Sequence, residues 1–483
     1  MFIRLRHEEH GIAMVISIMV AFVVMLLATV IFGQAIHQSG QSAYGRNRLT
    51  SVGAAEAGLN YWFNYIQQTT PSSLTTSPVS RTVGSSPATA TFIATPTYYS
   101  DTAGTTAFSG AISSSNAPLS VKVKSVGTVN GISRTMESFI TLTPVYAGIQ
   151  GAHISNSSTT FTNSFTVNGN SGNDADIYIL GSGAVFNVPS GLETIHGSIY
   201  VPAGSINSIG TGTHIYGQVW ANGLVLVNHP QAQIDGNISS TTSSVTVSPG
   251  AVGGNAYYCT GSAPSNVSGT KNSTCALGPP PSQSFPQVTY VQSAWVSAGY
   301  TNFQTFTGAS ACTDARDYVE STGAYAATGF SGHSVGNTVV RITQACVYSN
   351  SNNATITMNS NLAIITDSEI NLSQKSTWNG VTSQRDLFMI STWPAATCPA
   401  SGVAGSHNVT FGNLTGSNAL VETFVYTPCT ASMLNNNSSF IGQVIGTTLN
   451  IGNLFQETYK PIVVPGANLT GYTQNIAYIR EVA

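Results

Sequence analysis

The stretch that decides the fold is IHGSIY at residues 195–200, because it recurs along the chain. It returns as IYGQVW at 215–220 and IDGNIS at 234–239, and a weaker copy follows at 252–257. The glycines at the centre of the copies are 20, 19 and 18 residues apart: Gly197, Gly217, Gly236 and Gly254. A repeat of about 20 residues with alternating apolar positions and no helix between copies predicts a parallel β-solenoid, with rungs about 4.8 Å apart.

Period-2 alternation predicts which side chains of each copy face the solenoid core. The inward set is Ile195, Ile199, Ile215, Val219, Ile234 and Ile238. Because backbone hydrogen bonds hold the rungs together, a solenoid is stable with few charged side chains. Ser, Thr and Asn can therefore line its outer surface in ladders. Strand-like runs at 354–358, 362–366, 387–391 and 419–426, with a partial copy at 440–445, predict that the solenoid resumes late in the chain.

These patterns give the expected domain boundaries of the larger part of the chain. The solenoid is expected at 146–255 and its continuation with a C-terminal segment at 346–483. Between them, 256–345 is interpreted as a Cys-containing insertion with helices at 287–300 and 313–321.

Charged residues are rare, at 7% of the 483 residues against about 25% in typical soluble chains. Apolar residues make up 42%, so the chain can bury a sizeable core. The net charge is −3, and no Lys or Arg occurs between Arg134 and Lys271. Nucleic-acid binding needs clustered cations that neutralise phosphates, so this class of function is excluded.

The six cysteines all lie in the C-terminal half, and none has a CxxC spacing. An even count without metal-type spacing predicts disulfides and an oxidising compartment, with buried free thiols in a cytosolic protein as the alternative. Fifteen pairings are possible. Solenoid strands keep sequence neighbours close, so we favour Cys259–Cys275, Cys312–Cys346 and Cys398–Cys429.

Residues 12–32 form an apolar run of 21 residues behind a short polar segment that carries Arg4 and Arg6. A helix of that length covers about 31 Å, which is enough to span the hydrocarbon of a bilayer. Apolar residues then recur three or four apart up to Ile66, so one helix is expected over 12–70, with 12–32 in lipid and an amphipathic second half. Glycines in that second half favour a bend or a melted turn.

A small antiparallel sheet is expected in residues 71–145. Residues 71–87 read as a connector, and strand signals follow at 88–95, 119–126 and 132–142. Asn130-Gly131 between the last two is suited to the positive φ of a hairpin turn.

Residues 1–145 resemble the type IV pilus minor pilins of the PilX N-terminal family. The resemblance rests on a charged leader ending in Gly11, the apolar helix start and AAEAGL at 54–59. It implies that a prepilin peptidase removes residues 1–11, that Ile12 becomes a methylated N-terminus, and that the chain passes from membrane lipid into a fibre with other pilins and the pilus assembly machinery. One departure is Ile16, where such pilins usually carry Glu, and this favours a tip position over a repeating subunit.

The expected location is the inner membrane for a single-pass precursor and then an extracellular pilus. Arg4 and Arg6 compete with Arg46 and Arg48 as orientation signals, but the Cys-bearing bulk favours an N-inside orientation. A membrane anchor that never assembles, and a pseudopilin of a type II secretion system, remain alternatives.

Candidate catalytic and metal residues are few. The acidic sets are Asp174 and Asp176, Asp367 and Glu369, and Asp314, Asp317 and Glu320. The last set reads as a solvated helix face, and only Lys375 is a cation near the second set. Asp174 and Asp176 are a weak Ca²⁺ candidate, with a polar turn as the alternative. His196 and His214 have no Cys or carboxylate to complete a zinc site. We expect no cofactor and no catalysis.

Binding is the more credible role for the outer surface. Tyr200 and Trp220 are expected on adjacent rungs facing outward, with Gln218 and Asn237 beside them. Planar aromatic rings with amides suit glycan or protein surfaces, unless the insertion covers this ledge and makes it core.

The fold class expected is therefore α+β and mostly β. It comprises a long N-terminal transmembrane and amphipathic helix, a small pilin-like antiparallel sheet, and a right-handed parallel β-solenoid with a disulfide-bearing insertion. The expected function is that of a minor, tip-located pilin-like protein displaying the solenoid for surface or cell adhesion. A membrane-anchored β-helix enzyme acting on glycans is the main alternative.

Overall fold

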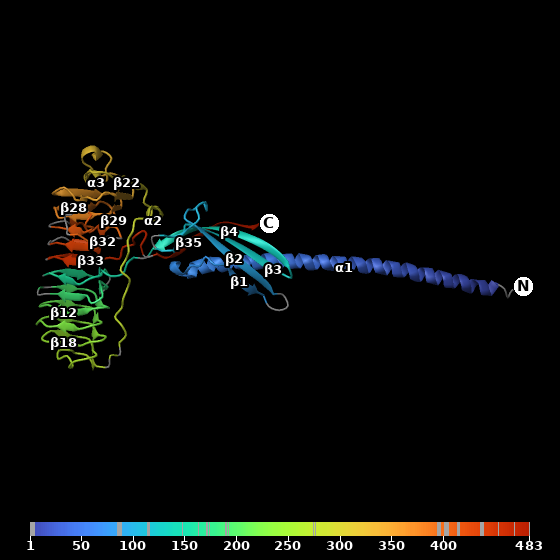
Figure 1. The fold of residues 1–483 in the computed structure, drawn as a ribbon, viewed down its shortest axis with the longest axis horizontal. Helices are drawn as coiled ribbons and strands as arrows, with labels where there is room; N and C mark the ends of the chain where they lie inside the picture. The colour runs from blue at the N-terminus through green and yellow to red at the C-terminus, as the bar shows by residue number, and fades with distance from the viewer. Residues whose placement is uncertain are drawn as a thin grey trace. The chain divides into compact units, whose positions relative to one another are not determined.

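A computed structural model describes residues 5–482, except for short gaps at 85–88, 114–115, 147, 163, 171, 173, 189–190, 192, 274, 276, 394–397, 400–404, 413–415, 435–438, 453 and 468. The fold class is confirmed: a long apolar helix is followed by a mostly β body with large parallel sheets (Figure 1). The chain forms two compact units, one from 1–112, 117–144 and 471–483, the other from 113–116 and 145–470.

Helix α1 runs unbroken over Leu5–Gln68. The side chains of its apolar residues from Ile12 to Phe32 are exposed, as a lipid-facing segment requires. By length and composition, α1 is the one helix in the described part of the chain that could cross a membrane. The melted turn that its glycines could have introduced is absent, because the helix continues past every one of them.

The second half of α1 is amphipathic, as expected. Its buried side chains recur at helical spacing and include Ala55, Leu59, Trp62 and Ile66, each with no more than 1% of its surface exposed. This stripe packs on strands β2 (Ala90–Tyr99) and β3 (Ser120–Val129), and Trp62 Nε1 donates a hydrogen bond to the carbonyl of Ala94 at 3.3 Å.

The sheet of the first unit has the order β1-β2-β3-β4-β35. Strands β1 (Val79–Val83), β2, β3 and β4 (Ile132–Tyr146) are antiparallel neighbours. Asn130 (φ 46°) and Gly131 (φ 79°) form the predicted turn between β3 and β4. A short 3-10 turn at Pro71–Ser73 follows α1.

Two glycines set the distance between helix and sheet. A Cβ on Gly127 would lie 2.0 Å from the carbonyl oxygen of Ser51, and a Cβ on Gly58 would lie 2.8 Å from the ring of Phe92. Larger residues at either position would push α1 off the sheet.

The second unit is the parallel solenoid. The strands of its N-terminal half are β5 (His153–Ser155), β6 (Thr159–Phe161), β7 (Thr166–Asn168), β8 (Ile177–Ile179), β9 (Val185–Val188), β10 (Thr194–Ile195), β11 (Ile199–Val201), β12 (Ser205–Ile209), β13 (His214–Ile215), β14 (Val219–Ala221), β15 (Val225–Val227), β16 (Gln233–Ile234), β17 (Ile238–Ser240), β18 (Val245–Val247), β19 (Ala251–Val252), β20 (Ala256–Tyr257) and β21 (Lys271–Asn272).

The C-terminal half contains α2 (Gln292–Ser297), β22 (Asn302–Phe306), α3 (Ala311–Glu320), a 3-10 turn (Gly323–Tyr325), β23 (Thr338–Ile342), β24 (Val347–Tyr348), β25 (Ala354–Met358), β26 (Leu362–Thr366), β27 (Glu369–Leu372), β28 (Ser376–Gly380), β29 (Arg385–Ser391), β30 (Val409–Phe411), β31 (Gly416–Ser417), β32 (Val421–Met433), β33 (Ser439–Ile451) and β34 (Gln456–Tyr459). The strand-like runs found in the sequence all fall on these strands, although the run at 419–426 starts two residues before β32.

The two halves form one stack in a permuted order. Parallel pairing runs β22-β23-β26-β29-β32-β33 and continues directly into β5-β8-β11-β14-β17-β20-β21. The chain therefore enters the stack at its middle, builds one half outward to β21, returns along the side to β22, and builds the other half back to the middle (Figure 1). We call the β33–β5 contact, together with the adjacent β34–β7 pairing, the joint.

The core of the stack is the inward set predicted from the repeats. All six predicted inward residues have 0% of their surface exposed. The repeat glycines also stack: Gly217 N donates to Gly197 O at 3.0 Å, and Gly236 N donates to Gly217 O at 3.1 Å. A Cβ on Gly217 would lie 2.4 Å from Gly197 O, so this column admits only glycine.

Two expected boundaries need correction. The solenoid extends past 255, because β20 and β21 add a further rung. The region 256–345 is not all insertion, since β22 and β23 pair in the stack. Within 346–483, the solenoid continuation ends with β34, and β35 (Leu469–Val482) of the C-terminal segment joins the sheet of the first unit. Sequence periodicity identifies local strands but not partners more than 300 residues away.

Three disulfides pair the six cysteines in the favoured nearest-neighbour order. Cys312–Cys346 ties α3, which covers the β22 end of the stack, to the residue before β24.

Candidate interaction site

The expected aromatic ledge exists as a column of rings on neighbouring strands. Tyr178, Tyr200 and Trp220 are in register on β8, β11 and β14. The rings of Tyr178 and Tyr200 stack with centroids 5.1 Å apart. Each ring therefore covers part of the other ring's face, and that part is not available to a ligand.

The two amides expected beside the ledge have protein partners. Gln218 Nε2 donates to the Tyr200 hydroxyl at 2.9 Å. Asn237 Oδ1 accepts the backbone N–H of Asn255 on the next rung at 2.8 Å. Both hold neighbouring rungs in register.

The segment 277–300, which we call the strap, runs back along the stack from the β21 end to β22 (Figure 1). Trp220 Nε1 donates to Thr241 Oγ1, and that hydroxyl donates to Gly278 O, each at 3.1 Å. Pro280 of the strap is buried, and only 7% of the Tyr200 surface is exposed. Tyr200 is thus buried and Trp220 half-buried, so the ledge offers little area to a ligand.

Further along, the strap lies on an apolar outer face of the solenoid. The Tyr426 hydroxyl donates to Pro286 O at 2.9 Å, and Trp295 packs edge-on against Phe388 with centroids 5.2 Å apart. The Arg341 guanidinium lies over the Tyr290 ring at 5.2 Å. The strap thus keeps large hydrophobic side chains away from water.

A second aromatic group was not identified as a site from the sequence. The Tyr216 ring lies between the rings of His196 and His214, at 4.1 and 4.0 Å. His214 Nε2 also lies 3.0 Å from Asp235 Oδ2. The repeat alignment could have revealed the first contact, because His196 and Tyr216 occupy the same position in successive copies. Both faces of the Tyr216 ring are occupied, which leaves only its edge for a partner.

A third face of the stack carries polar, uncharged side chains. On five of these strands, one such residue stands between two core residues, as Asn450 stands between Leu449 and Ile451. Ser208 instead follows the exposed Asn207 at a register shift in β12, and Asn228 follows the end of β15. These residues follow one another in register across the joint, with the Thr160 backbone between Asn450 and Asn187. We call this column the hydroxyl–amide face. Its members, in order along the stack and ending at Asn228, are Asn371, Thr410, Ser432, Asn450, Asn187, Ser208 and Asn228.

Hydrogen bonds connect neighbours along this face. Asn450 Nδ2 lies 3.4 Å from Ser432 Oγ, and Ser208 Oγ donates to Asn228 Oδ1 at 3.1 Å. Asn450 and Asn228 are exposed, whereas Thr410 is buried. The sequence analysis expected such ladders in general but did not locate this one.

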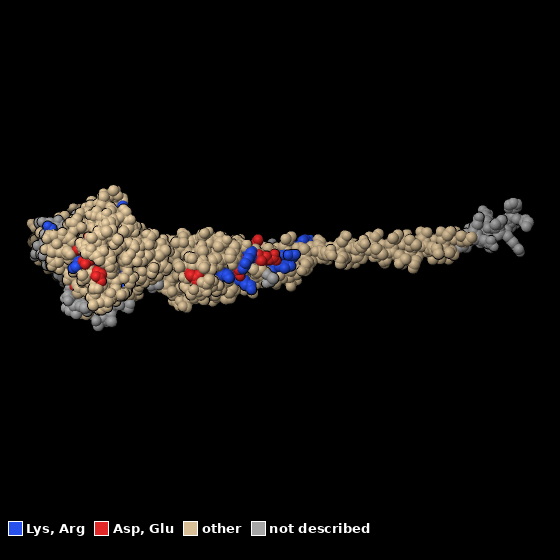
Figure 2. All heavy atoms as spheres, turned by 90° about the horizontal axis from the view of Figure 1, so that it is seen from above, with Lys and Arg blue, Asp and Glu red and all other residues tan. Residues whose placement is uncertain are grey.

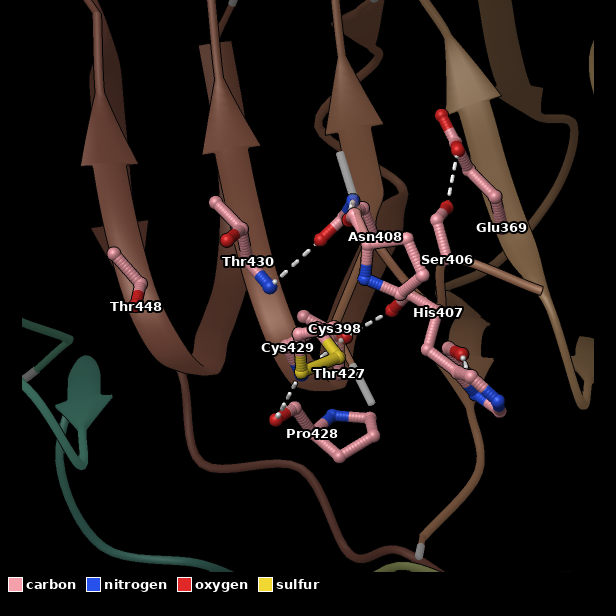
Figure 3. The surroundings of a disulfide bond; sticks show 12 residues. Glu369, Cys398, Ser406, His407, Asn408, Thr427, Pro428, Cys429, Thr430 and Thr448 are labelled. Atoms are coloured by element: carbon pink, nitrogen blue, oxygen red, sulfur yellow. Dashed lines mark hydrogen bonds between the residues drawn. A yellow bond between two sulfur atoms is a disulfide. The ribbon is translucent and has the colours of Figure 1, made fainter. Parts of the chain in front are cut away.

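A parallel column lies beside it and is drawn in Figure 3. Asn408 directly precedes β30, Thr430 and Thr448 are paired on β32 and β33, and Thr430 N donates to Asn408 Oδ1 at 3.0 Å. Glu369 stands at the end of this column, fully buried, and accepts a hydrogen bond from the Ser406 hydroxyl (Figure 3). The Cys398–Cys429 disulfide lies beside these residues.

The Ca²⁺ candidate has a partner of its own. Asp176 Oδ1 accepts the backbone N–H of Ser198 at 2.8 Å, and burial raises the pKa of the Asp176 carboxyl. Among the described residues, no group of three or more His, Cys, Asp or Glu side chains is placed to hold a metal ion.

The other acidic candidates are engaged locally. Asp367 pairs with Arg341 and accepts from Thr392, and Glu369 has 0% of its surface exposed. On α3, Asp317 pairs with Arg316 at 2.9 Å, and Asp314 accepts from Ser310 at 2.6 Å. The side chains of Asp314, Asp317 and Glu320 therefore do not form one site.

One acid pair was missed by sequence reasoning because its members are 36 residues apart. Asp386 and Glu422 lie in register on β29 and β32, and Lys460 pairs with Glu422. Burial, with the nearby Glu422 charge, raises the pKa of the Asp386 carboxyl. Asn361 Nδ2 donates to Asp386 Oδ2 at 3.2 Å, so the Asp386 carboxyl also has a hydrogen-bond partner.

The expected processing residues lie on α1. The backbones of Gly11 and Ile12 are helical, and the Ile12 side chain is 61% exposed. Met1 to Arg4 of the expected leader lie outside the described residues.

Charge is sparse over the solenoid surface. In Figure 2, the solenoid unit is drawn almost entirely in the colour of uncharged residues, with few acidic or basic atoms on the face shown. This agrees with the long stretch without Lys or Arg.

No family model and no curated protein matches the chain. Among solved structures, the chain is similar to the crystal structure of the competence-associated pilin ComZ from Thermus thermophilus, at 11% identity over 90% of this chain and 97% of that chain. The TM-score is 0.27, and a likeness at that score carries no argument about function. The function proposed below therefore rests on the geometry of this chain itself.

Proposed function

We propose that this chain is a pilin-like protein that is held in a membrane by α1, cut between Gly11 and Ile12 by a prepilin peptidase, and then assembled into an extracellular fibre. The supporting observation is α1 itself: an exposed apolar half suited to lipid continues without a break into a half packed on an antiparallel sheet. A helix of this kind can exchange lipid contacts for contacts with the helices of other pilins.

The proposed orientation places the N-terminus inside the cell and both compact units outside. The three disulfides support it, because they form and persist in oxidising compartments. Ile16, where the resembled pilins usually carry Glu, favours a place at the fibre tip, where no preceding subunit's amine needs a carboxylate partner.

We propose surface attachment as the role of the solenoid, with no catalytic step. The acids that a glycan-cleaving enzyme would need have other partners: Glu369 is buried against Ser406, Glu422 pairs with Lys460, and Glu457 is buried against His153. A general acid must reach its substrate. Release of new reducing ends from a panel of glycans by purified protein would contradict this part of the proposal.

Mass spectrometry of the mature N-terminus tests processing directly. Protein from piliated cells should begin at Ile12, with or without a methyl group. A Gly11→Val variant should retain residues 1–11, while Gly33→Ala, a change in open space on the same helix, should be processed normally. Protein that still begins at Met1 in piliated cells would refute the proposal.

Gene deletion separates the fibre role from the secretion role. Loss of fibres on deletion supports the pilin-like assignment. Normal fibres with loss of exoprotein export would instead identify a pseudopilin.

A further inference from the structure

We propose that the hydroxyl–amide face binds neutral polysaccharide. This inference rests on the proposed display function and names the surface and the ligand class through which the solenoid would attach. It differs from the aromatic ledge expected from the sequence, where Tyr200 is buried and Trp220 is half-buried.

The face is built as a regular array and not as a pocket. Five of its side chains, those of Asn371, Thr410, Ser432, Asn450 and Asn187, alternate with core residues on their strands, so the backbone fixes their direction. In-register parallel pairing spaces successive members by about 4.8 Å. A repeating array of hydrogen-bonding groups suits a ligand that is itself repetitive, namely a polymer laid along the stack.

The chemistry of the face selects among polymers. Hydroxyl and amide groups both donate and accept hydrogen bonds, as sugar hydroxyls do. Among the described residues of this face and its neighbouring column, the one charged side chain is Glu369, and it has 0% of its surface exposed. The face therefore has no exposed cation for a phosphate, sulfate or uronate group and no exposed anion for a polycation.

Other partner classes fit this face less well. Protein interfaces are enriched in Tyr, Trp, Phe, Met and Arg, which supply most of the binding energy. Lipid surfaces need exposed apolar side chains or basic clusters. The face has neither, because its exposed members are Asn450 and Asn228, and its half-buried members are Asn371, Ser432, Asn187 and Ser208. A neutral, hydroxyl-rich chain matches what remains.

The position of the face adds support. It crosses the joint without interruption, since Asn450 on β33 and Asn187 on β9 are linked in register through β6. The polar column is thus maintained by residues from both halves of the permuted stack, although no repeat in the sequence links the two halves there. Two further columns, at the ledge and at Tyr216, are interrupted by rings that stack on one another.

Affinity gel electrophoresis of detergent-solubilised full-length protein tests the proposal. The gels contain neutral glucans (dextran, hydroxyethyl cellulose) or neutral galactomannan, and anionic alginate or heparin serves as the comparison. We expect retardation in at least one neutral polymer that is insensitive to salt. Absence of retardation in all the neutral polymers, or retardation only in anionic polymers at low salt, overturns the proposal.

Matched variants locate the binding surface. Asn228→Ala with Asn450→Ala removes two exposed amides from the face and should weaken retention about tenfold, because the hydrogen bonds of both amides to the polymer are lost. Gln233→Ala with Gln456→Ala removes two exposed amides from β16 and β34, on another face, and should leave retention unchanged. Equal retention by both double variants overturns the proposal.

A third variant separates this face from the ledge. Tyr200→Ala with Trp220→Ala should not reduce retention if the hydroxyl–amide face is the binding surface. Loss of retention in this variant with an unchanged melting temperature would assign binding to the ledge and refute the proposal. Processing at Ile12 and fibre formation are measured on the same variants, so a failure of polysaccharide binding is distinguishable from a failure of the pilin-like function.

Discussion

His153 Nε2 and Glu457 Oε2 are hydrogen-bonded inside the solenoid, although the two residues are 304 positions apart in the chain. His153 begins β5, the first strand of one half, and Glu457 lies on β34, the last strand of the other half. Both side chains have 0% of their surface exposed, and Phe161 and Phe455 pack around the imidazole. The pair therefore holds the joint together from within.

Removing one member of this pair should destabilise the protein strongly. Glu457→Ala or His153→Ala leaves a buried polar group without its partner, and such losses typically cost about 3–5 kcal/mol. The measurement is denaturant unfolding of the full chain. The double variant His153→Leu with Glu457→Leu should recover part of the loss, because no unpaired group remains. Single variants as stable as the parent would show that the pair contributes nothing to the joint.

A second buried carboxyl predicts how stability changes with pH. Glu193 has 0% of its surface exposed, and burial raises the pKa of its carboxyl despite a hydrogen bond from Thr213 at 2.8 Å. A folded-state pKa above the unfolded value of about 4.3 means that the proton stabilises the folded form. This contribution is complete below the unfolded pKa and is lost as the pH rises through the folded pKa.

The Glu193→Gln variant should remove that dependence while keeping an acceptor for Thr213. Its denaturation midpoint should exceed the parent's at pH 8, and the difference should shrink toward pH 4.5. Asp101→Asn is the control, because the pKa of the Asp101 carboxyl is shifted in the opposite direction: backbone N–H donors lower it. A difference in denaturation midpoint between Glu193→Gln and the parent that does not change with pH would contradict the raised pKa of Glu193.

The glycine column predicts a position-specific packing cost. Gly217→Ala places a Cβ 2.4 Å from Gly197 O, so adjacent rungs must move apart, at a cost of about 1–3 kcal/mol. Gly278→Ala is the matched control in the same unit, because nothing lies within 4 Å of the position its Cβ would take. Thermal unfolding compares the two, and equal melting temperatures would mean that the rungs tolerate a side chain in the column.

Loss of the Cys312–Cys346 disulfide should affect the β22 end of the stack. This bond closes a sequence separation of 34 residues, and removing a disulfide of this kind costs about 2–4 kcal/mol. Cys312→Ser with Cys346→Ser should increase hydrogen exchange in α3 and β22–β24 and leave β11–β17, at the other side of the joint, protected. Uniform loss of protection along the stack would instead mean that the solenoid unfolds as one cooperative unit.

Local features were predictable from the sequence where a short pattern has one structural solution. The Asn130-Gly131 turn, the inward isoleucines such as Ile199, and the strands at 354–358 and 362–366 are of this kind. The alternative of a melted turn in α1 was wrong, because glycine lowers helix stability only modestly and the packed second half offsets the cost.

The order of the rungs and the location of the polar face were not predictable in the same way. Repeats indicate that β11 stacks on β14, but no local pattern states that β33 stacks on β5. The strap, the Asp386–Glu422 neighbours and the continuity of Asn450 with Asn187 all depend on that long-range order. Tyr200 was expected to be exposed, although only 7% of its surface is, with its ring stacked on Tyr178 and its hydroxyl bonded by Gln218.

The mid-stack entry of the chain has a mechanical consequence. Both ends of the solenoid segment 145–470 are covalently linked to the first unit, one after β4 and one before β35, and β4 and β35 are neighbours in one sheet. A tensile load on an attached solenoid is thus divided between these two links. A protease that nicks either link leaves the other to carry the load.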